Sequence, residues 1–166
     1  MKNIKLFIPA LIVILLDQTT KILVDIFIPI GTTKYSLFGD FLRIVHVRND
    51  AVAFSLGSSF DPLVKVALFI ILPLAVLTFV ALFMVREKDI SYFQRTLLSL
   101  LLGGGLGNLI DRIFRHMSVV DFISTNNYGL FGMDRFPTYN IADASVVISV
   151  ILLFITFFFK KKENKN

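Results

Sequence analysis

The 166-residue sequence has no cysteine, no tryptophan and only two histidines, His46 and His116. Without cysteine, the chain can form no disulfide, no thiol nucleophile and no thiolate metal site. Two histidines argue against a multi-histidine zinc site. We expect no cofactor. A G-x-S-x-G nucleophile elbow is missing as well, and serine has no lysine or histidine partner at a suitable spacing.

Apolar residues dominate what is present. They make up 55% of the chain, phenylalanine alone occurs 18 times, and the mean hydropathy is +0.77. A soluble protein of this size could not bury so much apolar surface, so the composition predicts a membrane protein, with residues 1–166 as one integral membrane domain. The net charge is +5, and the basic residues concentrate at the ends of apolar runs. This placement indicates contact with membrane lipid rather than with nucleic acid.

Four apolar runs are long enough to cross a bilayer, at about residues 6–28, 63–85, 97–114 and 141–159. No small-x-small cleavage site follows the first run, so we interpret it as a retained helix rather than a cleaved signal peptide. The sequence therefore predicts a mainly α fold, a four-helix transmembrane bundle.

The basic residues also indicate the orientation of the bundle. Nine of the 17 fall in short segments on one side if both termini are cytoplasmic: Lys2, Lys5, Arg86, Lys88, Arg95, Lys160, Lys161, Lys162 and Lys165. Because short cytoplasmic segments carry the excess of Lys and Arg, we expect both termini inside the cell.

Two longer segments would then lie outside. The first contains "FLRIVHVR", which is rich in β-branched residues and is followed by turn signals, so we expect a small extracytoplasmic β lobe at about residues 35–58. The second, residues 115–140, contains Gly, Asn and Pro and is predicted to be a loop.

Several polar residues lie inside the predicted spans. Asp17 and Lys21 are four residues apart and share one face of the first helix. An ionisable group at this depth costs about 2.5 to 3.5 kcal/mol unless it is paired. The two residues are either an ordinary pair, with Lys21 reaching to the outer surface, or a pair that faces the bundle for a function.

The stretch "GGGLGNLIDR", residues 103–112, combines a G-x-x-x-G pattern with polar residues. Such glycines let helix backbones approach closely. Gly104, Asn108 and Asp111 recur at i, i+4 and i+7, with Arg112 beside them, so they predict a polar stripe facing the bundle or a wet cleft. Alternatively, Asp111 and Arg112 only mark the end of the helix, which leaves Asn108 unexplained.

Two further aspartates flank the second outer segment. Asp143 follows Asn140 by three residues at the start of the fourth span, in the pattern of a capping box, and an acid there is also stabilised by the helix dipole. Asp121 follows two β-branched residues and is either a turn former or a functional group. In the predicted topology, both aspartates lie near the outer membrane surface.

Two neighbouring carboxylates repel each other when both are ionised, so one keeps its proton at neutral pH. Such a pair activates water with one oxygen and protonates a leaving group with another, as in aspartic proteases. The same carboxylates could serve a proton or cation transporter, although the inverted repeats typical of one are missing. A third alternative is a noncatalytic scaffold whose polar stripe only specifies helix packing.

Five sequence blocks, in this order, resemble the motifs of the bacterial lipoprotein signal peptidase (signal peptidase II) family. They are "DQTTK" at 17–21, "RNDAVAF" at 48–54, "GGGLGNLIDR" at 103–112, "VVDF" at 119–122 and "YNIADA" at 139–144. The likeness extends over essentially the whole chain.

The resemblance implies an aspartic endopeptidase of the bacterial cytoplasmic membrane that uses no metal. Its substrates would be prolipoproteins carrying diacylglycerol on the lipobox cysteine, cut just before that cysteine near the outer leaflet, and globomycin would inhibit it. Asp121 and Asp143 would be the catalytic pair. Supporting or substrate-binding roles would fall to Asp17, Lys21, Asn49, Gly104, Asn108, Asp111, Arg112 and Asn140. The β lobe would be the family's β-cradle, and the loop after Asp121 would hold its periplasmic helix.

The sequence departs from the family pattern at two positions. Ala51 replaces the usual glycine of the second block, and Tyr139 stands where phenylalanine is common. If the glycine has a positive φ, Ala51 costs about 1 kcal/mol and shifts the lobe. Neither change falls on the expected catalytic pair.

Overall fold

The computed structural model describes residues 4–50 and 60–163 of the chain. In chain order, its elements are η1 (Ile4–Phe7), α1 (Ile8–Phe27), β1 (Thr33–Leu37), β2 (Leu42–Asn49), α2 (Pro62–Val66), η3 (Ala67–Ile71), α3 (Leu72–Arg86), α4 (Tyr92–Phe114), β3 (Val119–Thr125), η4 (Leu130–Gly132) and α5 (Ile141–Glu163). Ala51 and the rest of residues 51–59, which include part of the second motif block and of the predicted β lobe, lie outside the described residues.

Four helical segments are long and apolar enough to cross a membrane: Ile4–Phe27, Pro62–Arg86, Tyr92–Phe114 and Ile141–Phe158. Large apolar side chains cover their outer surfaces, as at Leu11 (55% exposed), Phe79 (68%) and Phe154 (64%). Such a surface is stable next to lipid and not next to water. The predicted fold class, a mainly α membrane protein with a four-helix bundle and a small sheet, is confirmed.

Helix α4 is the centre of the bundle and packs against α1, α3 and α5. It begins at Tyr92 rather than near residue 97, because Ser91 and Gln94 form a capping box that satisfies the first backbone N–H groups. The guanidinium of Arg95, in this first turn, donates to the carbonyls of Met84 and Glu87 and so ties α4 to the end of α3.

The glycines of α4 allow its neighbours to come close. A Cβ atom at Gly103 would lie 2.7 Å from the carbonyl oxygen of Ala10 in α1. One at Gly104 would lie 2.4 Å from the carbonyl oxygen of Ala142 in α5. Both distances are shorter than any contact a side chain could make, so α4 can carry no side chain at these two positions.

The span from Pro62 to Arg86 is interrupted by the π-helical segment η3. Pro73, at the start of α3, has no N–H to donate to the preceding turn, which explains a wider turn at this point. The segment carries Phe69, a buried ring that faces α4 and contacts Arg112.

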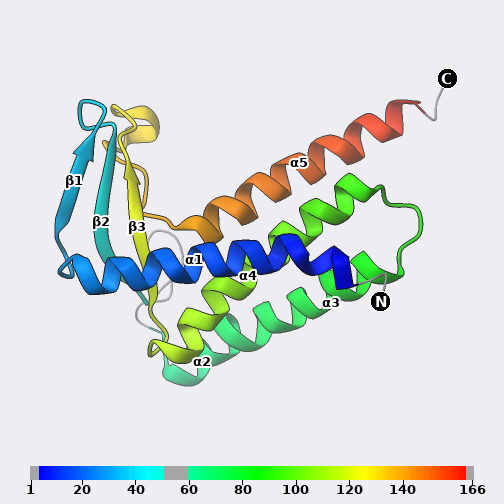
Figure 1. Cartoon of the computed structure of the whole chain (residues 1–166), viewed down its shortest axis with the longest axis horizontal. Helices are drawn as coiled ribbons and strands as arrows, with labels where there is room; N and C mark the ends of the chain where they lie inside the picture. The colour runs from blue at the N-terminus through cyan, green and yellow to red at the C-terminus, as the bar shows by residue number, and fades with distance from the viewer. Residues whose placement is uncertain (1–3, 51–59, 164–166) are drawn as a thin grey trace.

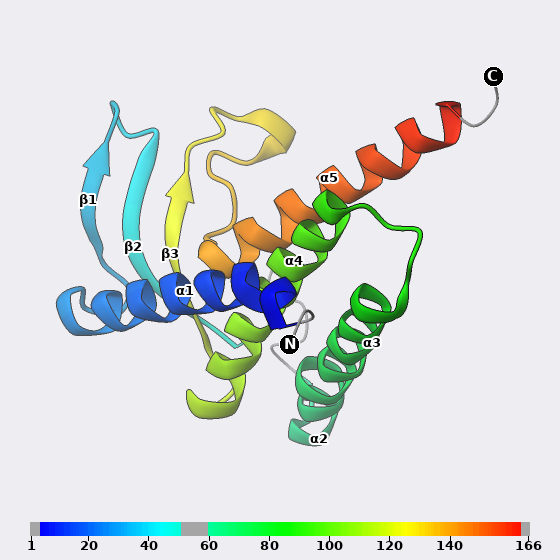
Figure 2. The same ribbon diagram turned by 45° about the vertical axis from the view of Figure 1, so that its right-hand side comes forward.

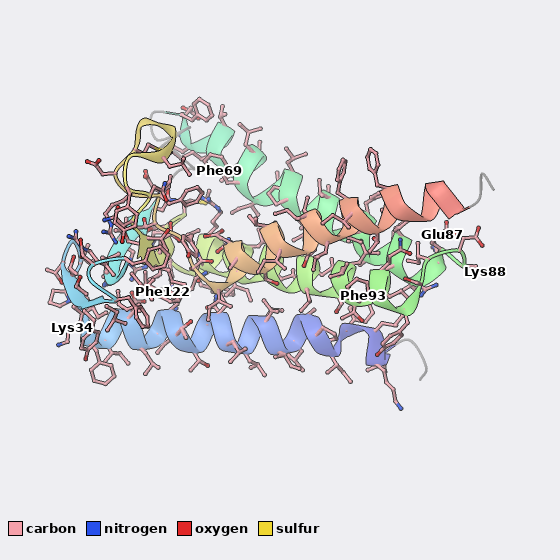
Figure 3. The ribbon with its side chains drawn as sticks, turned by 90° about the horizontal axis from the view of Figure 1, so that it is seen from above. Lys34, Phe69, Glu87, Lys88, Phe93 and Phe122 are labelled. Atoms are coloured by element: carbon pink, nitrogen blue, oxygen red, sulfur yellow. The ribbon has the colours of Figure 1, made fainter. Side chains whose placement is uncertain are left out.

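A three-stranded antiparallel sheet, in the order β1-β2-β3, stands at one end of the bundle. Figure 1 shows both chain termini at the opposite end, and Figure 2 shows the three strands side by side. In Figure 3, Lys34 marks the sheet end, whereas Glu87 and Lys88 mark the other end. The first and last segments of the chain therefore point away from the sheet.

The third strand was not predicted. Residues 119–125, expected as part of a loop, form β3 and pair with β2, with Asp121 opposite Val47. The run "VVDFIST" has the β-branched composition of a strand, and its partner β2 lies some 70 residues earlier, so no local turn signal joins them. The helix expected after Asp121 is the single 3-10 turn η4.

The tip of the sheet is fastened by Asp40, in the turn between β1 and β2. Its carboxylate accepts hydrogen bonds from Ser36 and from Arg43 (2.6 and 2.7 Å), and Arg135 lies 3.3 Å away. The hydrogen bonds from Arg43 and then Ser36 lower the pKa of Asp40 to about 2. Arg135 also donates to Ser124 in β3. Through Asp40 and Ser124, Arg135 therefore joins the β1–β2 turn and β3 to the segment that precedes α5.

Candidate active site

Asp121 and Asp143 approach the same place from different elements. Asp121 lies in the middle of β3 and is 2% exposed, whereas Asp143 is half-buried in the first turn of α5. The site is therefore the junction between the sheet and the helical bundle, close to the sheet end seen in Figure 1.

Asp143 takes part in the capping box suggested by the sequence. Its backbone N–H donates to Asn140 Oδ1 over 2.9 Å, and the backbone N–H of Asn140 donates to Asp143 Oδ2 over 3.1 Å. The other carboxylate oxygen accepts from Asn108 Nδ2 over 2.7 Å. Capping thus uses one oxygen of Asp143, and the polar stripe of α4 uses the other.

Asp121 also has a donor on each carboxylate oxygen. Asn140 Nδ2 donates to Oδ1 over 2.7 Å, and Asn49 Nδ2 donates to Oδ2 over 3.0 Å. Burial raises the pKa of Asp121 to about 7, with the negative charge of Asp143 acting in the same direction. The carboxyl of Asp121 is therefore poised to hold a proton near neutral pH.

Two asparagines join the aspartates, and donor-only groups set their orientation. Lys21 Nζ donates to Asn108 Oδ1 over 2.9 Å. An ammonium group cannot accept, so Asn108 must turn its oxygen toward Lys21 and its NH₂ group toward Asp143. In the same way, the backbone N–H of Asp143 fixes Oδ1 of Asn140 and leaves the NH₂ group of Asn140 for Asp121.

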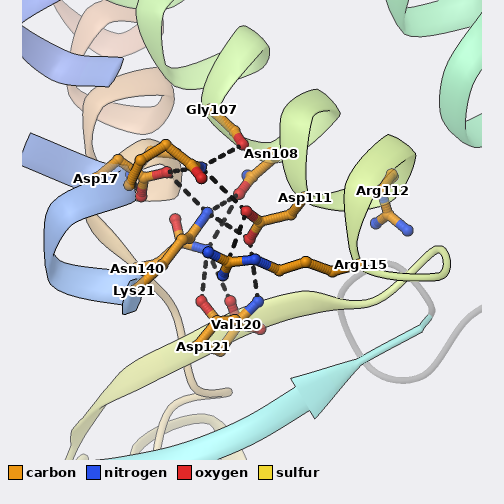
Figure 4. Close-up of polar contacts among 12 residues, drawn as sticks. Asp17, Lys21, Gly107, Asn108, Asp111, Arg112, Arg115, Val120, Asp121 and Asn140 are labelled. Carbon is orange, nitrogen blue, oxygen red and sulfur yellow. Dashed lines mark hydrogen bonds and ion pairs between the residues drawn. The ribbon is translucent and has the colours of Figure 1, made fainter. Parts of the chain in front are cut away.

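Lys21 does not reach the surface of the protein. It is 0% exposed and lies 2.8 Å from Asp17 Oδ2 and 2.9 Å from Asp111 Oδ2 (Figure 4). The first of the two interpretations of this pair is therefore wrong. With Asn108, the two carboxylates provide three acceptors for the three ammonium protons, which is the condition for burying a charge at this depth.

The same carboxylates hold the two elements that carry Asp121 and Asp143. Asp17 Oδ1 accepts from the backbone N–H of Ala142 in α5 over 3.0 Å. Asp111 Oδ2 accepts from the backbone N–H of Val120 in β3 over 3.2 Å. Helices α1 and α4 therefore fix the residues immediately before both aspartates.

Arg112 points away from this network in Figure 4. Its guanidinium lies 4.7 Å from the centre of the Phe69 ring and donates to the carbonyl of Met117 over 3.3 Å. The cation-π contact fixes its position beside the site, and its positive charge still attracts those of Asp121 and Asp143.

Within the described ranges 4–50 and 60–163, no three His, Cys, Asp or Glu side chains are grouped so that they could hold a metal ion. The charges at the site are instead paired with one another or with amides.

The comparisons with known proteins agree with one another. The family model described as signal peptidase (SPase) II matches residues 9–159. The lipoprotein signal peptidase of Borrelia turicatae (strain 91E135) is 45% identical over 160 residues, which cover 96% of this chain and 93% of the relative. The lipoprotein signal peptidase of Borreliella burgdorferi (strain ZS7) is 42% identical over 164 residues, which cover 99% of this chain and 94% of the relative.

Two solved bacterial membrane enzyme structures, both obtained by the in meso method, have the same fold. The one at 2.3 Å resolution has a TM-score of 0.81 and 34% identity, and the match covers 98% of this chain and 92% of that one. The one at 1.9 Å resolution has a TM-score of 0.77 and 33% identity, with 92% of each chain covered.

This chain belongs to the signal peptidase II family. It is a multi-pass bacterial membrane protease that removes signal peptides. No finding favours the transporter that the same carboxylates could have served. The family that the five motif blocks suggested is confirmed.

The structure brings all the predicted site residues to the junction, although Gly104 only gives α4 and α5 room to approach and Arg112 lies at the edge of the site. Two residues were missed. Gln18 Nε2 donates to Asp111 Oδ1 and to the carbonyl of Gly107, each over 3.0 Å. Arg115 Nη1 lies 3.6 Å from Asp111 Oδ1. Gln18 stands inside the "DQTTK" block, and Arg115 follows Asp111 by one helical turn, so both signals were present in the sequence.

Proposed function

We propose that this protein is an aspartic endopeptidase whose catalytic pair is Asp121 and Asp143. Its substrates are prolipoproteins with diacylglycerol on the lipobox cysteine, and it cuts just before that cysteine. The observation that carries the proposal is the junction of two carboxyl groups through Asn140, one of them with a pKa of about 7.

The chemistry follows from one proton held by the pair. The ionised carboxylate takes a proton from water as the water oxygen bonds to the scissile carbonyl carbon, and the protonated partner stabilises the developing oxyanion. The carbon–nitrogen bond then breaks, and the leaving nitrogen takes a proton from the pair. The proton belongs to the pair as a whole, because their titrations are coupled.

The other residues of the site keep the pair in place. Asn49, Asn108 and Asn140 donate to the carboxylates, and they also offer amide groups to a substrate backbone. Lys21 orients the amide of Asn108, and Asp17 and Asp111 hold Lys21 in place. Gly104 lets α4 and α5 approach. Arg112 balances negative charge at the edge of the site.

We further propose that the sheet end faces the outer leaflet and that both termini are cytoplasmic. The nine basic residues of the terminal and α3–α4 segments favour this orientation. The acyl chains of a lipidated cysteine lie in the outer leaflet, so the scissile bond is then near the aspartates. Membrane lipid and globomycin-type inhibitors are the further ligands expected at this end.

The test is cleavage of a diacylated precursor by the purified full chain in detergent, with and without globomycin. Asp121→Asn and Asp143→Asn should each abolish cleavage while the protein stays folded. Asp61→Asn is the matched control, because Asp61 is an exposed aspartate that caps α2 and Asn caps equally well. Cleavage that survives either substitution at Asp121 or Asp143 would refute the catalytic assignment.

A further inference from the structure

A second polar cluster lies beside the site and is not used by the proposed reaction. It consists of Asp25, His46, Arg48 and Arg115, and we call it the Asp25 cluster. Arg48 Nη2 donates to Asp25 Oδ1 over 2.7 Å. His46 Nε2 lies 3.1 Å from the same oxygen, and Arg115 Nη1 lies 3.3 Å from Asp25 Oδ2. The Arg115 contact is an ion pair without hydrogen-bond alignment, and the His46 contact is an ion pair only when the imidazole is protonated.

The Asp25 cluster joins three elements. Asp25 belongs to the last turns of α1, His46 and Arg48 belong to β2, and Arg115 directly follows α4. His46 is 2% exposed, and its Nδ1 donates to the carbonyl of Ile28 over 2.7 Å, which fastens β2 to the end of α1 a second time. The cluster therefore fixes the last residues of β2 against the bundle.

Strand β2 needs such an anchor. Its pairing with β3 is irregular between Ile44 and Val47, and the ladder ends at Asn49. Side chains alternate along a strand, so His46 and Arg48 point to one face, and Val47 and Asn49 point to the other. The second face carries Asp121, which is opposite Val47, and this places Asn49 diagonally within reach of Asp121.

We propose that Asp25 is a positioning residue for the cleavage reaction. Through Arg48, it holds the end of β2 so that Asn49 can donate its hydrogen bond to Asp121. The inference rests on the proposed function, since it concerns the geometry of the same aspartate, and Asp25 itself does not touch the reacting atoms.

The hydrogen bond from Asn49 lowers the pKa of Asp121, against burial. The largest other influences on Asp121 come from Asp143 in α5, Asn140 beside α5 and Lys21 in α1, and Arg112 in α4 also attracts its charge. These four groups lie outside the Asp25 cluster. Loss of one hydrogen bond to an ionised group raises a pKa by about one unit. The alkaline limb of the pH profile, where the pair loses its last proton, should then move to higher pH.

The experiment measures kcat/KM against pH for the full chain in detergent with a diacylated precursor. Asn49→Ala should move the alkaline limb up by about one unit, and Asp25→Ala should move it in the same direction. The double variant should move it no further than Asn49→Ala alone, because Asp25 acts through Asn49. Asp25→Glu, which keeps the charge, should return the limb toward the wild-type position.

Two further variants keep the result interpretable. Arg48→Gln breaks the same link from the strand side and replaces Asp25→Ala if that variant does not fold. Asp40→Ala breaks the other carboxylate–arginine contact of the sheet, far from Asn49 in the strand, and should leave the limb in place.

A limb that stays in place in Asp25→Ala or Arg48→Gln, or shifts that add in the double variant, would overturn the inference. Asp121→Asn, measured in parallel, separates this failure from that of the proposed function. If Asp121→Asn is inactive and the limb does not move, only the positioning role of Asp25 is wrong. If Asp121→Asn still cleaves, the catalytic assignment itself is wrong.

Discussion

Gly104→Ala should damage the active site through a single added methyl group. The new Cβ would lie 2.4 Å from the carbonyl oxygen of Ala142 and 2.8 Å from Val146 Cγ2. Ordinary contact begins near 3.4 Å, and a backbone carbonyl in a helix cannot turn aside. Helices α4 and α5 must therefore separate by about 1 Å at this level, because a packed interior has no free volume to absorb the change.

The separation acts on the hydrogen bond between the same two helices. Asn108, one turn after Gly104, donates to Asp143, the neighbour of Ala142, over 2.7 Å. An added 1 Å or so takes this contact beyond hydrogen-bond distance. We expect an overpacking cost of about 1 to 3 kcal/mol in the free energy of unfolding and a loss of about 100-fold in kcat/KM.

Gly105→Ala is the matched control. Its Cβ would meet only the side chain of Leu77 in α3, with Cδ2 at 2.5 Å, and a leucine end can change rotamer. Both variants are compared by thermal unfolding in detergent and by cleavage of a diacylated precursor. Gly105→Ala should stay within a few-fold of wild type. Equal losses in the two variants, or wild-type cleavage by Gly104→Ala, would show that the α4–α5 distance does not control the pair.

Two other predictions concern stability. Lys21→Met leaves the carboxylates of Asp17 and Asp111 buried without their cation, so unfolding in detergent should require about 3 to 5 kcal/mol less free energy; an unchanged unfolding curve would contradict the role of this lysine. The pKa of Asp121 is raised from 3.8 to about 7 in the folded protein, so the folded state binds the extra proton between these values and its stability falls as pH rises through that window. At about 1.4 kcal/mol per pKa unit, this contribution amounts to about 4 kcal/mol. The thermal midpoint of Asp121→Asn should therefore fall less than that of wild type between pH 4.5 and 8. An equal fall of the midpoint in both proteins would count against the raised pKa.

The parts of the fold that were predicted from the sequence depend on local patterns. Long apolar runs identified the bundle, and the spacing of Asn140 and Asp143 identified the capping box, because both signals lie within one element. The glycines of residues 103–107 indicated close helix contacts, although not which helix each glycine meets. Gly103 meets α1, whereas Gly104, only one residue later, meets α5.

The parts that were not predicted depend on partners far away in the chain. Strand β3 pairs with β2, and nothing within residues 115–140 indicates this pairing. Lys21 needed Asp111 and Asn108, about 90 residues later, before its burial could be recognised. The Asp25 cluster similarly combines residues from α1, β2 and the end of α4, and none of them indicates the others in the sequence.

The buried ions Lys21, Asp17 and Asp111 do more than hold the helices together. A buried ion pair contributes little net stability, because desolvation offsets most of the attraction. An asparagine amide, however, has two orientations of nearly equal shape, and a neighbour that can only donate or only accept hydrogen bonds distinguishes them. Lys21 is such a neighbour for Asn108. With the amide reversed, Asn108 would present an oxygen to Asp143, and two acceptors would face each other where a hydrogen bond now holds the carboxylate. The charge carried into the bundle by Lys21 therefore determines the direction of the hydrogen bonds around the pair, and an apolar side chain such as methionine could not set that direction.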